Sequence, residues 1–368
     1  MHHRNAYDIV LVGQGLAGSL LGWQLARTNR RLLIIDSASR YSASRVAAGL
    51  INPVTGRRLV KTKQLDLLLP VAFECYRTLE RRFHCTFLSR IQLLRLFQSA
   101  DEIALLEKRM ADPQYAPYLG RYYASGSKAD YLNDPCGSLT LRQAAVLDIG
   151  LLLDKLRRFF IRQGQYLQHQ LEYHHISLDS ELIRLQCANL QLTTRRLIFC
   201  EGHRATGNPW FSWLPFKPAE GSILSLETAA CLGERLLNAG KWLLPTGKTK
   251  SGFGYKLGAT YDWELDRDNR AGARQELLSG LAKVLNPRTL HNTDVRILAQ
   301  QTGVRPCTHD RQPYLGMHPR LPGLGIFNGF GSKGALLIPW FAAAFARHLL
   351  SGDALPEAGS IARVALHD

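Results

Sequence analysis

The 368-residue sequence lacks several features that would place it in other protein classes. Its seven cysteines form no C-x-x-C pair and its twelve histidines are dispersed, so we expect neither a disulfide framework nor a metal site. We also expect no secretory leader before the first strand. The apolar stretch 335–346 is short for a membrane span and contains Pro339. These absences predict a cytoplasmic protein with reduced thiols and no transmembrane segment.

Acidic residues are comparatively few. The chain has 46 Lys and Arg against 30 Asp and Glu, a net charge of +16. The basic residues are scattered rather than clustered in runs. This favours the interpretation that they are ordinary solvent-exposed surface residues, although binding to nucleic acid or to an anionic membrane stays possible. The length suggests roughly two domains, although one large α/β domain with a long insertion also fits.

A pattern typical of dinucleotide binding opens the chain. An apolar strand is expected at residues 7–12, followed by the GxGxxG of residues 13–18 and by helical spacing over residues 17–25. A second apolar strand, residues 32–35, ends at Asp36. Strand, glycines, helix, strand and carboxylate in this order make the pattern far more specific than its glycines alone.

Each residue of this pattern has a physical role. Gly13 permits a tight turn, Gly15 lets the backbone approach a pyrophosphate, and Gly18 lets the helix lie close to the strand. The helix N-terminus offers unpaired N–H groups to the pyrophosphate. The Asp36 carboxylate can accept hydrogen bonds from a ribose and argues against NADP, whose phosphate it would repel. FAD and NAD both remain possible, because they share the ADP moiety.

A second glycine-rich segment lies near the other end of the chain. Residues 329–334 form another GxGxxG before an apolar helix expected over residues 335–350. Such a helix end presents N–H donors to an electron-rich group, for example the N1–C2=O edge of a reduced flavin. Pro339 is unfavourable early in a helix, so we expect the helix to start a turn later or to bend there.

The rest of the chain gives weaker signals. In the loop 42–53, small residues can pass close to a flat ligand and Arg45 can neutralise a phosphate, although simple packing explains the loop equally well. Residues 196–200 predict a strand that ends near Gly202, and residues 147–161 a helix.

Hairpin-like patterns at residues 241–245 and 253–261 predict an antiparallel sheet, capped by a helix over 274–285. We expect a helical region 75–145 to join this sheet. Tyr255 and Tyr261 are candidate substrate-pocket residues.

These motifs, in this order, resemble the D-amino-acid oxidase superfamily, in the branch that contains glycine oxidase and sarcosine oxidase. The resemblance rests on GQGLAG with Asp36, SRVAAGLINP, LIFCEG, Glu220-Gly221, GVRP and NGFGSKG, and covers nearly the whole chain. It implies an α/β fold in which a Rossmann-like FAD-binding domain is interrupted by an α+β, antiparallel-sheet substrate domain. We assign residues 1–75, 145–205 and 300–368 to the FAD-binding domain, and 76–144 and 206–299 to the substrate domain.

The resemblance also implies site residues. In relatives the arginine of a G-x-R-P segment pairs with the substrate carboxylate, and Arg305 stands there; a structural salt bridge is the alternative. Lys333 lies near the second helix end and is a second candidate catalytic residue. We expect non-covalent FAD, because Gly303 occupies the position where sarcosine-oxidase relatives carry the linking cysteine. Cofactor contacts are predicted from Gly13, Gly15, Leu16, Ala17, Gly18, Asp36, Ser37, Ser44, Arg45, Ala48, Gly49, Leu50, Gly202, Gly329, Gly331, Ser332, Lys333 and Gly334.

The expected activity is oxidation of the C–N bond of an amino acid or related small amine, by hydride transfer to flavin N5. Water would hydrolyse the imine, and O₂ or a quinone would accept the electrons. Two alternatives stay open: a tRNA-modifying flavoprotein that removes a carboxymethyl group from a wobble uridine, and a non-catalytic FAD-binding subunit. A nicotinamide-dependent dehydrogenase is less favoured, because the second glycine-rich helix would then have no role.

Overall fold

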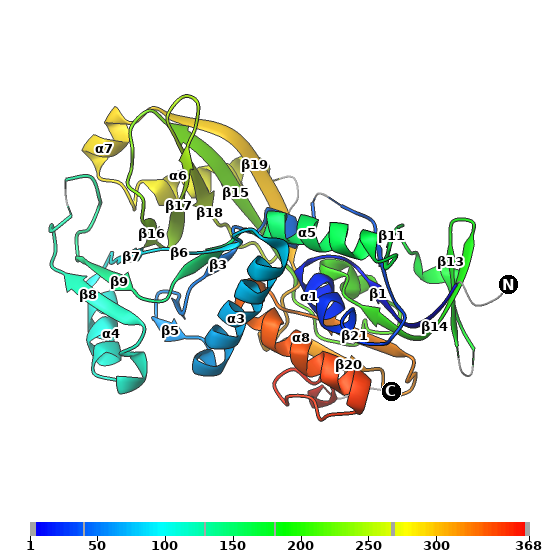
Figure 1. The fold of residues 1–368 in the computed structure, drawn as a ribbon. Helices are drawn as coiled ribbons and strands as arrows, with labels where there is room; N and C mark the ends of the chain where they lie inside the picture. Colours follow the sequence, from blue (N-terminus) through cyan, green and yellow to red (C-terminus); the bar gives the residue numbers. More distant parts are fainter. Residues whose placement is uncertain (1–4, 40, 129, 180–181, 266–268, 365–368) are drawn as a thin grey trace.

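The computed structural model describes residues 5–39, 41–128, 130–179, 182–265 and 269–364. Two large β-sheets lie side by side, with helices packed around and between them (Figure 1). The predicted α/β fold is confirmed.

The first sheet has the order β11-β2-β1-β14-β13-β12, and β21 pairs with both β14 and β20. Its strands are β1 (Ala6–Val12), β2 (Leu32–Asp36), β11 (Tyr166–Gln168), β12 (Ile176–Leu178), β13 (Ile183–Cys187), β14 (Leu190–Phe199), β20 (Tyr314–Met317) and β21 (Leu324–Asn328). Strands β11, β2, β1, β14 and β21 run parallel. The apolar side chains of β2, β21 and the second half of β1 are buried on both faces, as is typical of parallel strands. Ligands of such sheets bind beyond the carboxyl ends of the strands.

The second sheet has the order β19-β15-β18-β17-β16-β7-β9-β8. Its strands are β7 (Leu93–Leu96), β8 (Leu119–Tyr123), β9 (Ser138–Leu141), β15 (Ala219–Thr228), β16 (Leu236–Ala239), β17 (Lys241–Lys248), β18 (Phe253–Gly258) and β19 (Val295–Arg305). The predicted hairpin forms as the antiparallel pair β17–β18, while β16 and β7 pair in parallel.

The region 75–145 was predicted to be helical, and this is only partly correct, because it also supplies β6 (Leu88–Arg90), β7, β8 and β9. Leu93–Leu96 is buried on both faces, and so short an apolar run does not reveal its period. The smaller sheets are β3 (Leu50–Ile51), β10 (Ala145–Leu147) and β6 (Leu88–Arg90), and β4 (Val54–Thr55) with β5 (Val60–Lys61).

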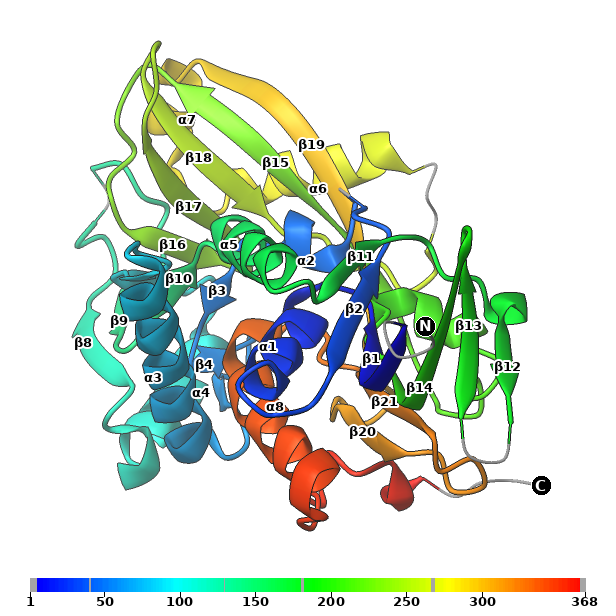
Figure 2. The same ribbon diagram turned by 45° about the vertical axis from the view of Figure 1, so that its right-hand side comes forward.

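The helices fill the space between and around the sheets. They are α1 (Leu16–Leu25), α2 (Ala43–Val46), α3 (Leu65–Phe83), α4 (Ala100–Met110), α5 (Ile149–Arg162), α6 (Arg270–Leu281), α7 (Pro287–Asn292) and α8 (Gly334–Ser351), with 3₁₀ turns at Pro113–Tyr115, Tyr173–His175, Gly202–Gly207 and Ile361–Arg363. Helix α5 crosses close to α1 at the junction of the two sheets (Figure 2). The helix predicted over 274–285 begins four residues earlier, at Arg270.

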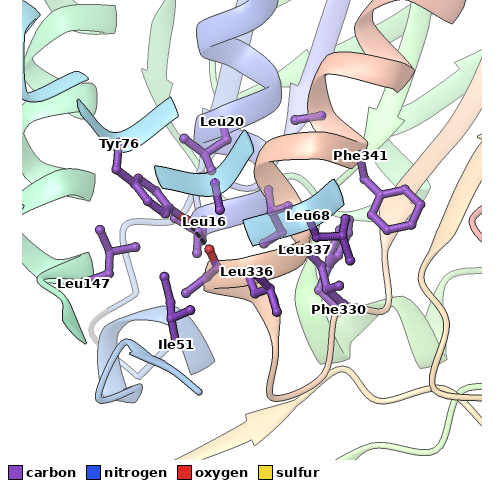
Figure 3. Close-up of a cluster of buried hydrophobic side chains, with 14 of the residues drawn as sticks. Leu16, Leu20, Ile51, Leu68, Tyr76, Leu147, Phe330, Leu336, Leu337 and Phe341 are labelled. Atoms are coloured by element: carbon purple, nitrogen blue, oxygen red, sulfur yellow. Dashed lines mark hydrogen bonds between the residues drawn. The ribbon is translucent and has the colours of Figure 1, made fainter. Parts of the chain in front are cut away.

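Helix α8 packs against α1 and α3 through a cluster of buried apolar side chains (Figure 3). The helix starts at Gly334 and runs through Pro339, so the predicted delayed start is wrong. Proline has no N–H and leaves the carbonyl four residues earlier, that of Ala335, without its helical partner. The buried Tyr76 hydroxyl donates a hydrogen bond to this carbonyl at 2.7 Å. A side chain from α3 thus supplies the hydrogen-bond donor that Pro339 lacks.

Among the described residues, α8 is long and apolar enough to cross a membrane by length and composition. However, 61% of this stretch is buried inside the structure, against α1 and α3. This is the environment of a core helix in a folded domain.

The division into two domains stays a prediction. Its boundaries at 75/76, 205/206 and 299/300 fall inside α3, the 3₁₀ turn Gly202–Gly207 and β19. A boundary after Arg305 would keep β19 whole within the second sheet. The seven cysteines are free thiols, and the cytoplasmic location also stays a prediction.

Candidate cofactor and substrate site

A cavity of about 400 Å³ lies where the carboxyl ends of β1, β2 and β14 meet the second sheet. Its walls include residues 13–17 of the first glycine-rich segment and Gly331, Ser332 and Gly334 of the second. Both ends of the chain therefore contribute backbone to one cavity.

The glycines of the first segment divide into two kinds. A methyl group at Gly18 would overlap the carbonyl oxygen of Gly13, and Gly13 itself has φ +102°. Glycine is required at both positions because α1 packs closely against the end of the sheet. At Gly15 a methyl group would meet only Ser44 Oγ, at 3.2 Å, and would otherwise extend into the cavity. The space beside Gly15 fits a ligand that approaches the backbone closely, such as a pyrophosphate.

Both helix N-termini bring amide donors to the cavity. At α1, the Leu16 N–H donates to Ser44 Oγ at 3.0 Å, whereas the N–H groups of Gly15 and Ala17 have no partner among the described residues. At α8, the same holds for Ser332 and Gly334. Unpaired amides at a helix start are suited to binding anionic groups.

Asp36 closes one end of the cavity at the tip of β2. Its Oδ1 accepts the Gln14 N–H at 2.8 Å, and its Oδ2 accepts the Ala38 N–H at 2.8 Å. The Arg157 guanidinium, from α5, also reaches Oδ2 at 3.2 Å. An acid at this place is suited to a ribose hydroxyl.

The loop between β2 and β3 forms one long wall. Arg45, predicted to neutralise a phosphate, forms a 2.7 Å ion pair with Asp154 of α5 and also lines the cavity. Gly49 has φ +72° and lies against the Leu147 carbonyl, where a side chain would overlap the backbone. The other predicted residues of the wall are Ser37, Ser44, Ala48, Leu50 and, from the opposite side, Gly202.

Arg305 lies at the end of β19, in the cavity wall. Its guanidinium crosses Gly221, donates to the Glu220 carbonyl at 3.2 Å and stacks over Tyr261, 4.8 Å from the ring centroid. Burial lowers the pKa of Arg305, but arginine still titrates far above neutral pH. No carboxylate of the described residues forms an ion pair with it, so the structural salt bridge considered for Arg305 is not seen there.

Of the predicted cofactor contacts and catalytic residues, three do not line the cavity: Gly18, Gly329 and Lys333. Gly18 serves helix packing, and Gly329, at φ +84°, lies against Thr308. Lys333 caps α8, and its Nζ donates to Thr62 Oγ1 at 3.0 Å. Burial, and then the nearby positive charge of Arg311, lower its pKa. A cofactor or catalytic role for these three stays a prediction.

The structure adds wall residues that the sequence did not reveal, among them Gln14, Arg157 and Trp242. The hairpin pattern around Trp242 was recognised, but strand periodicity does not say which face meets a ligand. Neither of the two candidate tyrosines lines the cavity, although Tyr261 lies beside Arg305. Tyr255 is buried in the second sheet, where its hydroxyl accepts the Leu232 N–H at 2.7 Å, and it does not line the cavity.

Residues 8–348 match the model of the DAO family, described as FAD dependent oxidoreductase, and this range contains both glycine-rich segments and Arg305. The chain belongs to this family. It is 26% identical over 363 residues to a glycine oxidase of Geobacillus kaustophilus (strain HTA426), covering 92% of this chain and 91% of that protein.

Solved structures agree on the fold. The iminodiacetate oxidase of Chelativorans sp. BNC1 superimposes with a TM-score of 0.76 at 20% identity, covering 95% of this chain and 96% of that one. The glycine oxidase from Geobacillus kaustophilus superimposes with a TM-score of 0.74 at 18% identity, covering 99% of this chain and 100% of that one.

Family membership settles the choice between FAD and NAD that the first motif left open: the protein is an FAD-dependent oxidoreductase. The cavity fits this cofactor. Asp36, the space beside Gly15 with the α1 amides, and the α8 amides all border this cavity, so they would hold the adenosine ribose, the pyrophosphate and the flavin end respectively.

Proposed function

We propose that this FAD-dependent oxidoreductase oxidises the C–N bond of an amino acid or a related small amine that carries a carboxylate. The observation that carries the proposal is the Arg305 guanidinium, placed in the cavity wall with no carboxylate partner among the described residues. A partly buried cation without a carboxylate partner is costly, and a substrate carboxylate would offset that cost. The named activities of the glycine oxidase and iminodiacetate oxidase relatives agree with this substrate chemistry.

When bound, FAD would accept a hydride from the substrate carbon that bears the nitrogen. The chain's own part is binding and orientation. Arg305 would hold the carboxylate in a bidentate pair, which fixes the position of the neighbouring carbon. The apolar wall of Ile223, Trp242 and Ala259 would exclude water from the reacting bond.

The α8 amides of Ser332 and Gly334 would stabilise negative charge that develops on the far side of the site. No side chain is assigned as a general base, because an amine that binds deprotonated needs none. Water would convert the imine to a keto acid or aldehyde and the free amine. We propose O₂ or a quinone as electron acceptor, to be distinguished by the rate at which each reoxidises the reduced protein.

The experiment compares matched substrates with and without a carboxylate, such as glycine and methylamine, on the wild type and on Arg305→Lys and Arg305→Met. We expect both variants to raise KM for the carboxylated amine while the flavin spectrum stays unchanged. Arg296→Met is the matched control, because Arg296 lies on the same strand but is exposed and paired with Glu227.

Unchanged kinetics in the Arg305 variants would remove the role of Arg305. Salt-sensitive tRNA binding without turnover of any free amine would favour the RNA-modifying alternative.

A further inference from the structure

Gln14 is the variable residue between the first two glycines of the GxGxxG motif, and its side chain is fully engaged. It is buried, and its Nε2 donates to Ser19 Oγ at 2.9 Å and to the Leu153 carbonyl of α5 at 3.0 Å. Its Oε1 accepts a hydrogen bond from Arg157 Nε at 2.8 Å. One side chain therefore joins the glycine-rich loop to a helix that is more than a hundred residues away in the sequence.

Arg157 contacts Asp36 as well as Gln14. Its Nε is held by Gln14, its Nη2 lies 3.2 Å from Asp36 Oδ2, and the guanidinium stacks over Tyr166 at 5.5 Å from the ring centroid. Arg157 is only partly exposed and lines the cavity. Its Nη1 has no hydrogen-bond partner among the described residues, so it can still donate to a ligand.

The two oxygens of Asp36 are used unequally. Oδ2 accepts from Ala38, Arg157 and, at 3.4 Å, the Tyr166 hydroxyl, whereas Oδ1 accepts only from the Gln14 N–H among the described residues. A carboxylate oxygen has about two acceptor sites. The protein therefore fixes Oδ2 and leaves an acceptor site on Oδ1 in the cavity.

We propose that Gln14 and Arg157 are positioning residues for the adenosine end of the cofactor. Together they hold the Asp36 carboxylate so that Oδ1 receives the 2′-hydroxyl of the adenosine ribose. The proposal depends on FAD binding alone and not on which amine is oxidised.

The test measures release of FAD from the holoprotein on dilution, followed by flavin fluorescence, for FAD and for an analogue with a 2′-deoxyadenosine moiety. The wild type should retain FAD about tenfold better than the analogue, the scale of a hydrogen bond to a charged group. Arg157→Met and Gln14→Leu should release FAD faster and lose most of this discrimination. Arg157→Lys should restore part of it. If Arg157 acts only through Asp36, adding Arg157→Met to Asp36→Asn should not reduce further the preference for FAD over the 2′-deoxy analogue.

Arg158→Met is the matched control, since Arg158 is the next residue of α5 and is exposed. It should behave as the wild type. A purely structural role would weaken binding of FAD and the analogue equally, and that result would overturn the proposal. So would an Arg157→Met variant indistinguishable from Arg158→Met. Flavin reduction by substrate at saturating FAD should be unchanged in Arg158→Met. Because release of FAD is measured without substrate, the test fails or succeeds independently of the proposed activity.

Discussion

The guanidinium group of Arg305 lies across Gly221, in the space that a side chain at position 221 would fill. Arg305 ends β19 and Gly221 lies on the neighbouring strand β15, so the glycine is what allows the arginine to lie flat against the sheet. The predicted Glu220-Gly221 and GVRP motifs therefore lie on neighbouring strands, and the first provides the space that the Arg305 side chain of the second occupies.

Gly221→Ala should displace the guanidinium without altering its charge. We expect KM for carboxylated amines to rise by about tenfold or more, as for loss of a charge-assisted hydrogen bond, while flavin content is retained. Steady-state kinetics measure the effect. Gly207→Ala is the control, because a methyl group there would meet no atom within 4 Å. Equal KM values for Gly221→Ala and the wild type would contradict the role given to this contact.

Gly15→Ala and Gly18→Ala should fail in different ways. A methyl group at Gly18 overlaps backbone, which should lower the free energy of unfolding by about 1–3 kcal/mol, whether or not FAD is present. A methyl group at Gly15 extends into the cavity, so it should weaken FAD binding and leave the stability of the FAD-free protein nearly unchanged. Denaturation with and without added FAD distinguishes the two. If Gly15→Ala bound FAD normally, the position assigned to the pyrophosphate would be wrong.

Tyr76→Phe should destabilise the fold by about 1–3 kcal/mol, because it leaves the buried Ala335 carbonyl without a donor. In a Pro339→Ala background the same substitution should cost less, since residue 339 then supplies the helical N–H. Urea denaturation of the four proteins gives the coupling between the two sites. Additive effects would show that the hydroxyl does not compensate for the proline.

Lys333 should make stability depend on pH at the alkaline end. Burial lowers its pKa below the ordinary 10.5, so the unfolded chain binds more protons in the window between the lowered value and 10.5. The free energy of unfolding should therefore rise with pH across that window. Lys333→Met should lack this rise, whereas a control at the exposed Lys63, Lys63→Met, should keep it. Denaturation from neutral pH to 10.5 measures the difference, and parallel curves for Lys333→Met and the wild type would contradict it.

The sequence predicted the parts of the site that are local. The first glycine-rich motif, Asp36 and the second helix end each follow from a strand-turn-helix order within a short segment, and each lies where that order predicts. Arg305 followed from a resemblance. The contacts between distant segments left no sequence signal.

Gln14 meets Arg157 across 143 positions and Tyr76 meets Ala335 across 259. Lys333 was expected near the flavin from its position beside the glycines, but spacing does not fix the direction of a capping side chain, which here reaches Thr62.

The most direct test of the central claim is anaerobic mixing of the purified, FAD-loaded protein with a panel of small amino acids and amines, followed by its visible absorption. We expect the bands of bound oxidised flavin, bleached by at least one carboxylated amine and restored by O₂ or a quinone. A protein that binds no flavin after reconstitution would contradict the assigned cofactor site. Bound flavin that no amine bleaches would contradict the proposed activity.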